Sequence, residues 1–190
     1  MRRSHQLALA LIGVLLASAA LQGNAFAVLV ADFNSGKKPN NIEGDFGAWN
    51  KDPNDKTQGC QNSFYNDPDK GDICLKLKYD VDSPNPAYSG FWMGLMDQDM
   101  SKLSELVISI KGDANAGYTD QVKLELKNGK EAGRYLLTGI TEEWQEFSVP
   151  LKEFAGITDW SAMKEFVIVF DDVNSTVKEG AVYVDDISFE

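Results

Sequence analysis

The sequence predicts an all-β protein, an antiparallel β-sandwich of the jelly-roll type with about nine strands. Three observations favour this class: short segments alternate between apolar and polar residues, turn-forming residues separate them, and helix signals are poor. Residues 75–79 are apolar at every second position, as in a half-buried strand. Val122, Leu124 and Leu126 alternate with charged residues, and Asn128-Gly129 follows as a turn. Many short strands with regular turns are typical of a sandwich or jelly roll.

The remaining strands are predicted from similar segments. Residues 166–170 are apolar at every position, which predicts a strand buried on both faces. The other strands are expected, in chain order, at residues 28–33, 88–95, 106–110, 133–138, 144–149 and 182–189. Only residues 151–154 and 160–163 are compatible with single helical turns, and Pro150 suits the first helical position. Residues 34–71, rich in Asn, Asp, Gly and Pro, are expected to form loops.

The first 27 residues are expected to be a signal peptide. Arg2 and Arg3 precede an apolar run over residues 7–21, and Ala25-Phe26-Ala27 supplies small residues for cleavage. The alternative is an uncleaved anchor, although the run is short for a membrane span. We therefore expect an exported protein, periplasmic or extracellular, in which residues 28–190 form one β-sandwich domain with no membrane span.

Composition excludes several functions for this domain. Residues 28–190 carry 16 Lys and Arg against 29 Asp and Glu, a formal charge of −13, which disfavours nucleic acid as a partner. The only histidine is His5, within the expected signal peptide. The mature chain therefore lacks the imidazole that Ser-His-Asp and Cys-His catalysis and histidine-ligated metal sites require.

Cys60 and Cys74 are the only cysteines. An even count in an exported protein favours a disulfide between them. Two unpaired thiols are the alternative.

The second half of the chain contains motifs that carry a resemblance. Residues 144–154 read W-x-x-F-x-V-P-L-x-x-F, residues 106–113 read L-V-I-S-I-K-G-D, and residues 182–189 read V-Y-V-D-D-I-S-F. Their order resembles galactose-binding-like jelly rolls, in particular family 11 type carbohydrate-binding modules and the complex-I intermediate-associated (CIA30-like) domain. The resemblance implies two packed antiparallel sheets, no catalysis within the module and often a structural calcium ion.

A structural calcium site is expected where the first and last strands meet. The resemblance places ligands at Asp185 and Asp32, and Asp186 is adjacent. Calcium prefers six to eight oxygen ligands, which the polar loop residues Asn34, Glu43 and Asp45 could complete. The alternative is that these carboxylates cap turns without a metal. The Asp-rich segment 67–72 lacks the glutamate that a twelve-residue calcium loop needs, and is predicted to be a turn.

A glycan-binding face is expected on one concave sheet. Sugar rings are recognised by aromatic platforms together with planar hydrogen-bonding groups. The candidate ligand-binding residues are Tyr88, Trp92, Lys123, Glu125, Arg134 and Tyr135. The alternative is that these aromatic residues belong to the core, and Trp144 and Trp160 are expected in the core or at its edge. Trp49 lies in a polar segment, and the sequence is compatible with its capping one end of the sandwich or contacting a ligand.

The predicted function is an exported, non-catalytic module that binds a polysaccharide or glycan and holds a structural calcium ion. The first alternative is a protein-interaction or envelope-assembly module on the same fold, with another envelope protein as partner. The second is a small carboxylate-dependent glycosidase. Residues 142–143 and 171–172 are paired acids, but they are expected to be solvated strand ends.

Overall fold

Alternating side chains along the strands define the core of this protein. In β7 (Gln121–Lys127), Val122, Leu124 and Leu126 are buried, whereas the charged residues between them point to the other side of the sheet. The computed structural model describes residues 27–190 and contains eleven strands in that range. The all-β antiparallel fold predicted from the sequence is confirmed, with two more strands than expected.

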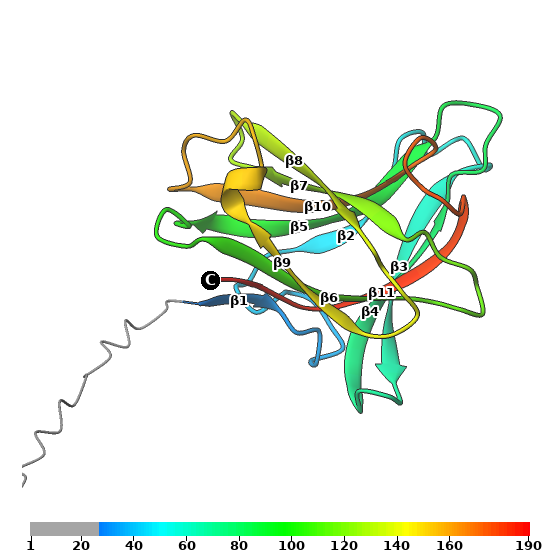
Figure 1. Ribbon diagram of the computed structural model, residues 1–190, viewed down its shortest axis with the longest axis horizontal. Coiled ribbons are helices and arrows are strands. Elements are labelled where there is room, and N and C mark those ends of the chain that lie inside the picture. Colours follow the sequence, from blue (N-terminus) through cyan, green and yellow to red (C-terminus); the bar gives the residue numbers. More distant parts are fainter. Residues whose placement is uncertain (1–26) are drawn as a thin grey trace, which may run out of the picture.

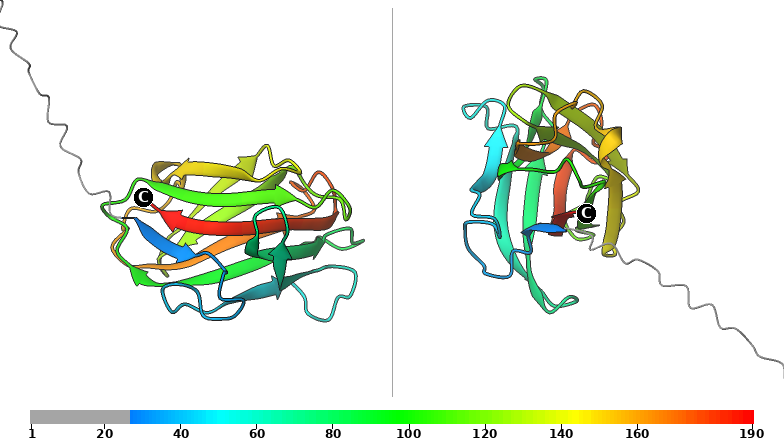
Figure 2. Two further views of the ribbon diagram at one scale, coloured as in Figure 1. Left: turned by 90° about the horizontal axis from the view of Figure 1, so that it is seen from below. Right: turned by 90° about the vertical axis from the view of Figure 1, so that its left-hand side faces the viewer.

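The strands form two antiparallel sheets that lie face to face (Figures 1 and 2). Sheet A contains, in spatial order, β3 (Gly59–Asp67), β4 (Asp72–Asp80), β11 (Glu179–Phe189), β6 (Glu105–Gly112) and β9 (Gln145–Pro150), with β1 (Val28–Ala31) also paired to β11. Sheet B contains β2 (Phe46–Asn50), β5 (Tyr88–Gln98), β10 (Met163–Asp171), β7 and β8 (Ala132–Thr138). The first and last strands are therefore neighbours in sheet A (Figure 1).

The core fills the space between the two sheets. Sheet A contributes Leu75 and Leu77 of β4, and sheet B contributes Phe91 of β5 and Phe166 of β10, all fully buried. The stacked rings of Tyr79 and Phe170, 4.2 Å apart, join the sheets near one end. Residues 166–170 are all buried, as predicted.

The two strands missing from the sequence prediction, β2 and β3, lie in the polar segment that was expected to form loops. Their asparagines link the edges of the two sheets. The side chain of Asn62 in β3 accepts a hydrogen bond from the backbone N–H of Ala48 in β2 (2.9 Å), and that of Asn50 accepts one from Cys60 N–H (2.7 Å). Polar side chains in this segment therefore accept hydrogen bonds from backbone N–H groups. The segment lacks the alternation of apolar and polar residues from which the other strands were predicted.

One of the two predicted helical turns forms. Residues Leu151–Glu153 make a single 3-10 turn directly after Pro150. The second, at residues 160–163, is irregular and leads into β10. Within residues 27–190, no helix is long and apolar enough to cross a membrane.

The predicted disulfide between Cys60 and Cys74 is wrong, because both thiols are free and buried. In the β3–β4 ladder Cys60 lies opposite Tyr79, and Cys74 lies opposite Tyr65. The cysteines are therefore five ladder positions apart, roughly 17 Å at the usual strand rise, whereas a disulfide needs Cα atoms within about 7 Å. Burial raises the pKa of Cys60 to about 12.

Candidate functional site

A large cleft lies on the face of sheet B that points away from the core. It has a volume of about 1090 Å³, and residues of all five strands of sheet B line it, with β2 and β8 at its two edges. Its lining comprises three aromatic residues, seven charged residues and four others: Trp49, Tyr88, Trp92, Lys123, Glu125, Lys127, Arg134, Glu165, Val167, Val169, Asp171, Asp172, Val173 and Asn174.

The aromatic residues line the β2–β5 side of the cleft. Trp49 is in β2, and Tyr88 and Trp92 are in β5. The rings of Trp49 and Tyr88 meet edge to face with centroids 5.9 Å apart. Tyr88 is 42% exposed, and the Lys51 ammonium lies 5.0 Å from its ring centroid. This side therefore offers apolar ring surface to a ligand.

Two glycines make room for the indole rings. Gly90 is the ladder partner of Trp49, and a Cβ there would lie 3.2 Å from the Trp49 ring and 2.0 Å from the carbonyl oxygen of Ile168. Gly47 is the ladder partner of Trp92, and a Cβ there would lie 3.5 Å from Trp92 Nε1. The indoles can lie against the sheet because their cross-strand neighbours have no side chains.

Charged residues line the other side of the cleft, on β10, β7 and β8. They form three ion pairs: Lys123–Asp171 at 2.7 Å, Arg134–Glu125 at 2.8 Å and Lys127–Glu165 at 2.6 Å. Two of these pairs follow from the strand register, which places Glu125 opposite Arg134 and Lys127 opposite Glu165. The cleft is therefore polar on this side, and each of its three cations is paired with a carboxylate.

Asp171 is a buried carboxylate at one end of the charged side. Its side chain is 9% exposed, and it accepts hydrogen bonds from Lys123 Nζ and from the Asn174 side chain. Burial raises the pKa of Asp171, but the hydrogen bonds from Lys123 and Asn174 outweigh this effect and hold the pKa below its ordinary value. Asp171 is therefore an anionic acceptor at neutral pH.

The structure brings together most of the predicted ligand-binding residues. Five of them line the cleft: Tyr88, Trp92, Lys123, Glu125 and Arg134. The placement of Tyr135 in the binding face is corrected, because its ring packs against the core, 6.0 Å from the Phe154 ring. Arg134 and Tyr135 are adjacent in β8, and successive strand residues point to opposite faces.

Several residues of the cleft were not among the ligand-binding residues predicted from the sequence. Trp49 was not assigned because β2 was not recognised. Asp171 and Asp172 were expected to be solvated strand ends, yet both line the cleft, and Glu165 and Lys127 line it although neither was a predicted site residue. The alternation of charges in β7 could have placed Lys127 beside Lys123 and Glu125.

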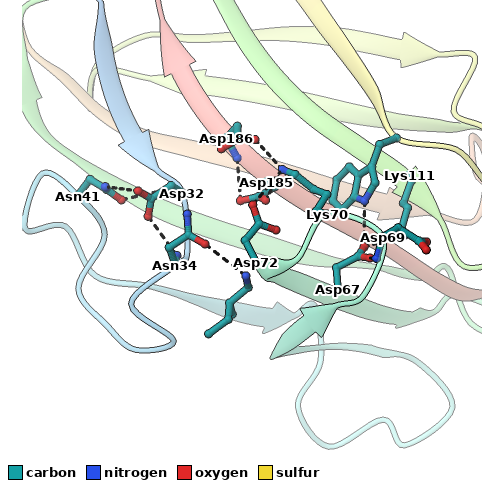
Figure 3. A network of polar contacts seen from close by, with 12 residues as sticks. Asp32, Asn34, Asn41, Asp67, Asp69, Lys70, Asp72, Lys111, Asp185 and Asp186 are labelled. Atoms are coloured by element: carbon teal, nitrogen blue, oxygen red, sulfur yellow. Dashed lines mark hydrogen bonds and ion pairs between the residues drawn. The ribbon is translucent and has the colours of Figure 1, made fainter.

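The residues expected to bind calcium lie near β1 and β11. Lys70 Nζ lies between Asp185 and Asp186, at 2.5 and 2.7 Å from their carboxylates (Figure 3). Asp32 lies apart from this group and is hydrogen-bonded to the Asn41 side chain and to the backbone of Asn34, both at 3.1 Å. Among the loop residues, Asp45 pairs with Lys38 at 2.7 Å. The prediction did not include a lysine in this group.

The outer face of sheet A holds a second buried polar group. Lys111 Nζ lies 2.7 Å from Asp67, which also accepts a hydrogen bond from Trp144 Nε1 at 2.9 Å. Burial raises the pKa of Asp67, but its bonds to Lys111 and Trp144 lower it below the ordinary value. Trp144 was expected in the core or at its edge and instead lies on this outer face, whereas Trp160 packs against the core.

Comparison with known proteins identifies the family to which this chain belongs. The family model for Carbohydrate binding domain 30 matches residues 38–190. The chain therefore belongs to the family described as Carbohydrate binding domain 30. Comparison with curated proteins gives no match.

Solved structures of other carbohydrate-binding modules share the fold. A family 11 module of a cellulosomal cellulase of Clostridium thermocellum is 17% identical with a TM-score of 0.64, covering 86% of this chain and 94% of that chain. The same values hold for a Clostridium thermocellum family 11 module in complex with a β-1,3-1,4-mixed-linked tetrasaccharide. A family 28 module described as specific for non-crystalline cellulose is 17% identical with a TM-score of 0.53, covering 87% and 95%. The resemblance to family 11 modules is confirmed.

Proposed function

We propose that this protein is a non-catalytic module that binds a neutral glycan chain in the cleft of sheet B. The observation that carries this proposal is the division of the cleft into an aromatic side and an ion-paired side. Membership of a carbohydrate-binding family supports it independently.

The aromatic side suits the apolar faces of sugar rings. Trp49, Tyr88 and Trp92 present ring surface from two neighbouring strands. Carbohydrate C–H groups can pack on such rings, while the sugar hydroxyls remain free to reach polar neighbours. The aromatic side therefore supplies binding surface without requiring charge on the ligand.

The ion-paired side suits hydroxyl groups and disfavours charged sugars. Three cations face four carboxylates along the lining, and every one of the three cations is already paired. An anionic ligand would have to break such pairs and approach a domain whose formal charge is −13. A neutral sugar can instead accept from Arg134 or donate to Asp171 while the pairs persist.

Two of the structural neighbours suggest which neutral glycans to test. One is a family 11 module in complex with a β-1,3-1,4-mixed-linked tetrasaccharide, and another is a module described as specific for non-crystalline cellulose. We propose β-glucan chains of these kinds as the first ligands to test for this protein.

The absence of catalysis is part of the proposal. A glycosidase needs a carboxylic acid whose pKa is raised so that it can donate a proton. The pKa of Asp171 in the cleft is instead lowered by Lys123 and Asn174, despite its burial. We expect no hydrolysis of any glycan that binds.

The test is a binding screen combined with one matched variant. Affinity electrophoresis with soluble mixed-linked β-glucan, hydroxyethyl cellulose, xylan, alginate and polygalacturonate separates neutral from anionic ligands. We expect retardation by at least one neutral polymer, abolished or weakened in Trp92→Ala and preserved in Trp144→Ala, which removes an indole from the opposite sheet. Retardation by the polyuronates alone, or equal losses in both variants, would contradict the proposal.

We also propose that the protein is exported and that residues 1–27 are removed. Residues 1–26 lie outside the described part of the structure. Intact-mass measurement of the protein from its native host should give a chain that begins at Val28; a full-length chain would contradict this proposal.

A further inference from the structure

A β-bulge in β11 brings two successive aspartates to the outer face of sheet A. The pairing of β11 with β6 gains one residue between Asp185 and Ser188, and Asp186 adopts a left-handed φ of 46°. Ile187 returns to the core after this bulge. The side chain of Asp185 is fully buried, whereas that of Asp186 is about half exposed. A buried carboxylate is costly unless a cation or several donors compensate its charge.

Lys70 supplies that cation from the turn between β3 and β4. Its Nζ lies 2.5 Å from Asp185, 2.7 Å from Asp186 and 3.9 Å from Asp72 (Figure 3). It also lies 4.8 Å from the centroid of the Trp144 ring. The lysine side chain is 21% exposed, so this ion pair is shielded from solvent on most sides.

A second lysine fixes the beginning of the same turn. Lys111 of β6 contacts Asp67 at 2.7 Å and Asp69 at 3.3 Å, and its Nζ lies 5.2 Å from the Trp144 ring centroid. Lys70 therefore links the β3–β4 turn to β11, and Lys111 links it to β6. Asp67 and Asp185, the two fully buried carboxylates of the cluster, each have their own ammonium group.

This arrangement does not fit the calcium site that the family resemblance implies. Calcium needs about six to eight oxygen ligands around one point. In the part of the chain that the structure describes, no three acidic, cysteine or histidine side chains are arranged to hold a metal ion. Asp32 is engaged by Asn41 and Asn34 instead, and an ion at Asp185 would have to displace the Lys70 ammonium.

We infer that Lys70 is the built-in counter-ion of Asp185 and ties the β3–β4 turn to the last strand without a metal. Because the cation is covalently part of the chain, its effect on stability does not depend on the calcium concentration. This inference and the prediction of a structural calcium site therefore make opposite predictions for chelation.

Thermal unfolding with and without chelator is the first test. We expect the Tm of the protein from residue 28 onward to agree within about 1 °C in excess EDTA and in millimolar calcium. A saturated structural site would raise the Tm by several degrees, because a ligand that binds only the folded state stabilises it. A Tm that falls on chelation and returns with calcium would overturn the inference.

Removal of the lysine is the second test. Lys70→Met leaves Asp185 buried without its cation and should lower the Tm by on the order of 10 °C. Lys164→Met is the matched control, because Lys164 pairs with Asp97 at 2.6 Å but both side chains are more than half exposed. It should change the Tm by about 2 °C or less. Equal effects of the two substitutions would overturn the inference.

A double variant keeps the test decisive if Lys70→Met does not fold. Asp185→Asn combined with Lys70→Met removes both charges, so no buried carboxylate remains without a partner. We expect the double variant to fold and to have a higher Tm than Lys70→Met. A double variant no more stable than the single one would show that Lys70 does not act through the charge of Asp185.

Discussion

Replacement of Trp92 by alanine is the most informative perturbation of the cleft. The indole lies over Gly47 on the aromatic side, and its burial in the free protein is intermediate. A fully buried aromatic side chain covers about 150–250 Å², so one free face of this ring offers roughly 60 Å² to a sugar. At about 25 cal/mol per Å² this contact contributes about 1.5 kcal/mol, which is roughly tenfold in Kd.

The assay is isothermal titration with a soluble neutral β-glucan oligosaccharide. The expected result for Trp92→Ala is a Kd raised about tenfold or more, with circular dichroism and Tm close to those of the unmodified protein. Trp144→Ala, on the outer face of sheet A, should leave the Kd unchanged. A folded Trp92→Ala protein that keeps its full affinity would refute the assignment of this ring as a sugar platform.

Three further predictions concern stability and thiol chemistry. Gly90→Ala should lower the free energy of unfolding by about 1–3 kcal/mol or more, because its Cβ would lie 2.0 Å from the carbonyl oxygen of Ile168. Gly47→Ala should lower it by less, and thermal unfolding of the two variants measures the difference. Ellman's reagent should modify neither cysteine in the native protein and both after denaturation, since burial raises the pKa of both thiols to about 12; modification in the native state would contradict the buried placement. Burial raises the pKa of Asp113, but hydrogen bonds from Lys76 and Tyr183 lower it to about 2, so its stabilising effect is complete above about pH 4 and is lost as the pH falls toward 2. The Tm difference between the unmodified protein and Asp113→Asn should therefore shrink over that range, and a constant difference would argue against the ionised pair.

The parts of the fold that local patterns determine could be predicted from the sequence. The alternation in β7 places Val122, Leu124 and Leu126 in the core and exposes Lys123 and Glu125 on the other face. The same rule could have separated Arg134 from Tyr135, since adjacent strand residues cannot both face the cleft. The prediction for Tyr135 was wrong because it depended on residue type alone and not on the alternation of side chains along the strand.

The parts that long-range pairing determines could not be predicted. The register of β3 with β4 separates Cys60 from Cys74, and nothing in their sequence spacing indicates that register. Lys70 and Asp185 are 115 residues apart and meet only because β4 pairs with β11. Strand β2 was missed, and Trp49 with it, because asparagine side chains satisfy backbone groups where an apolar pattern was expected.

The most direct test of the proposed function is an NMR titration that follows the four indole N–H signals. On addition of a neutral β-glucan oligosaccharide, we predict that the signals of Trp92 and Trp49 shift with saturation, because both rings line the cleft of sheet B. The signals of Trp144 and Trp160, which lie outside that cleft, should stay in place. Saturable shifts at Trp144 with none at Trp92 or Trp49 would place binding on the opposite sheet and contradict the account.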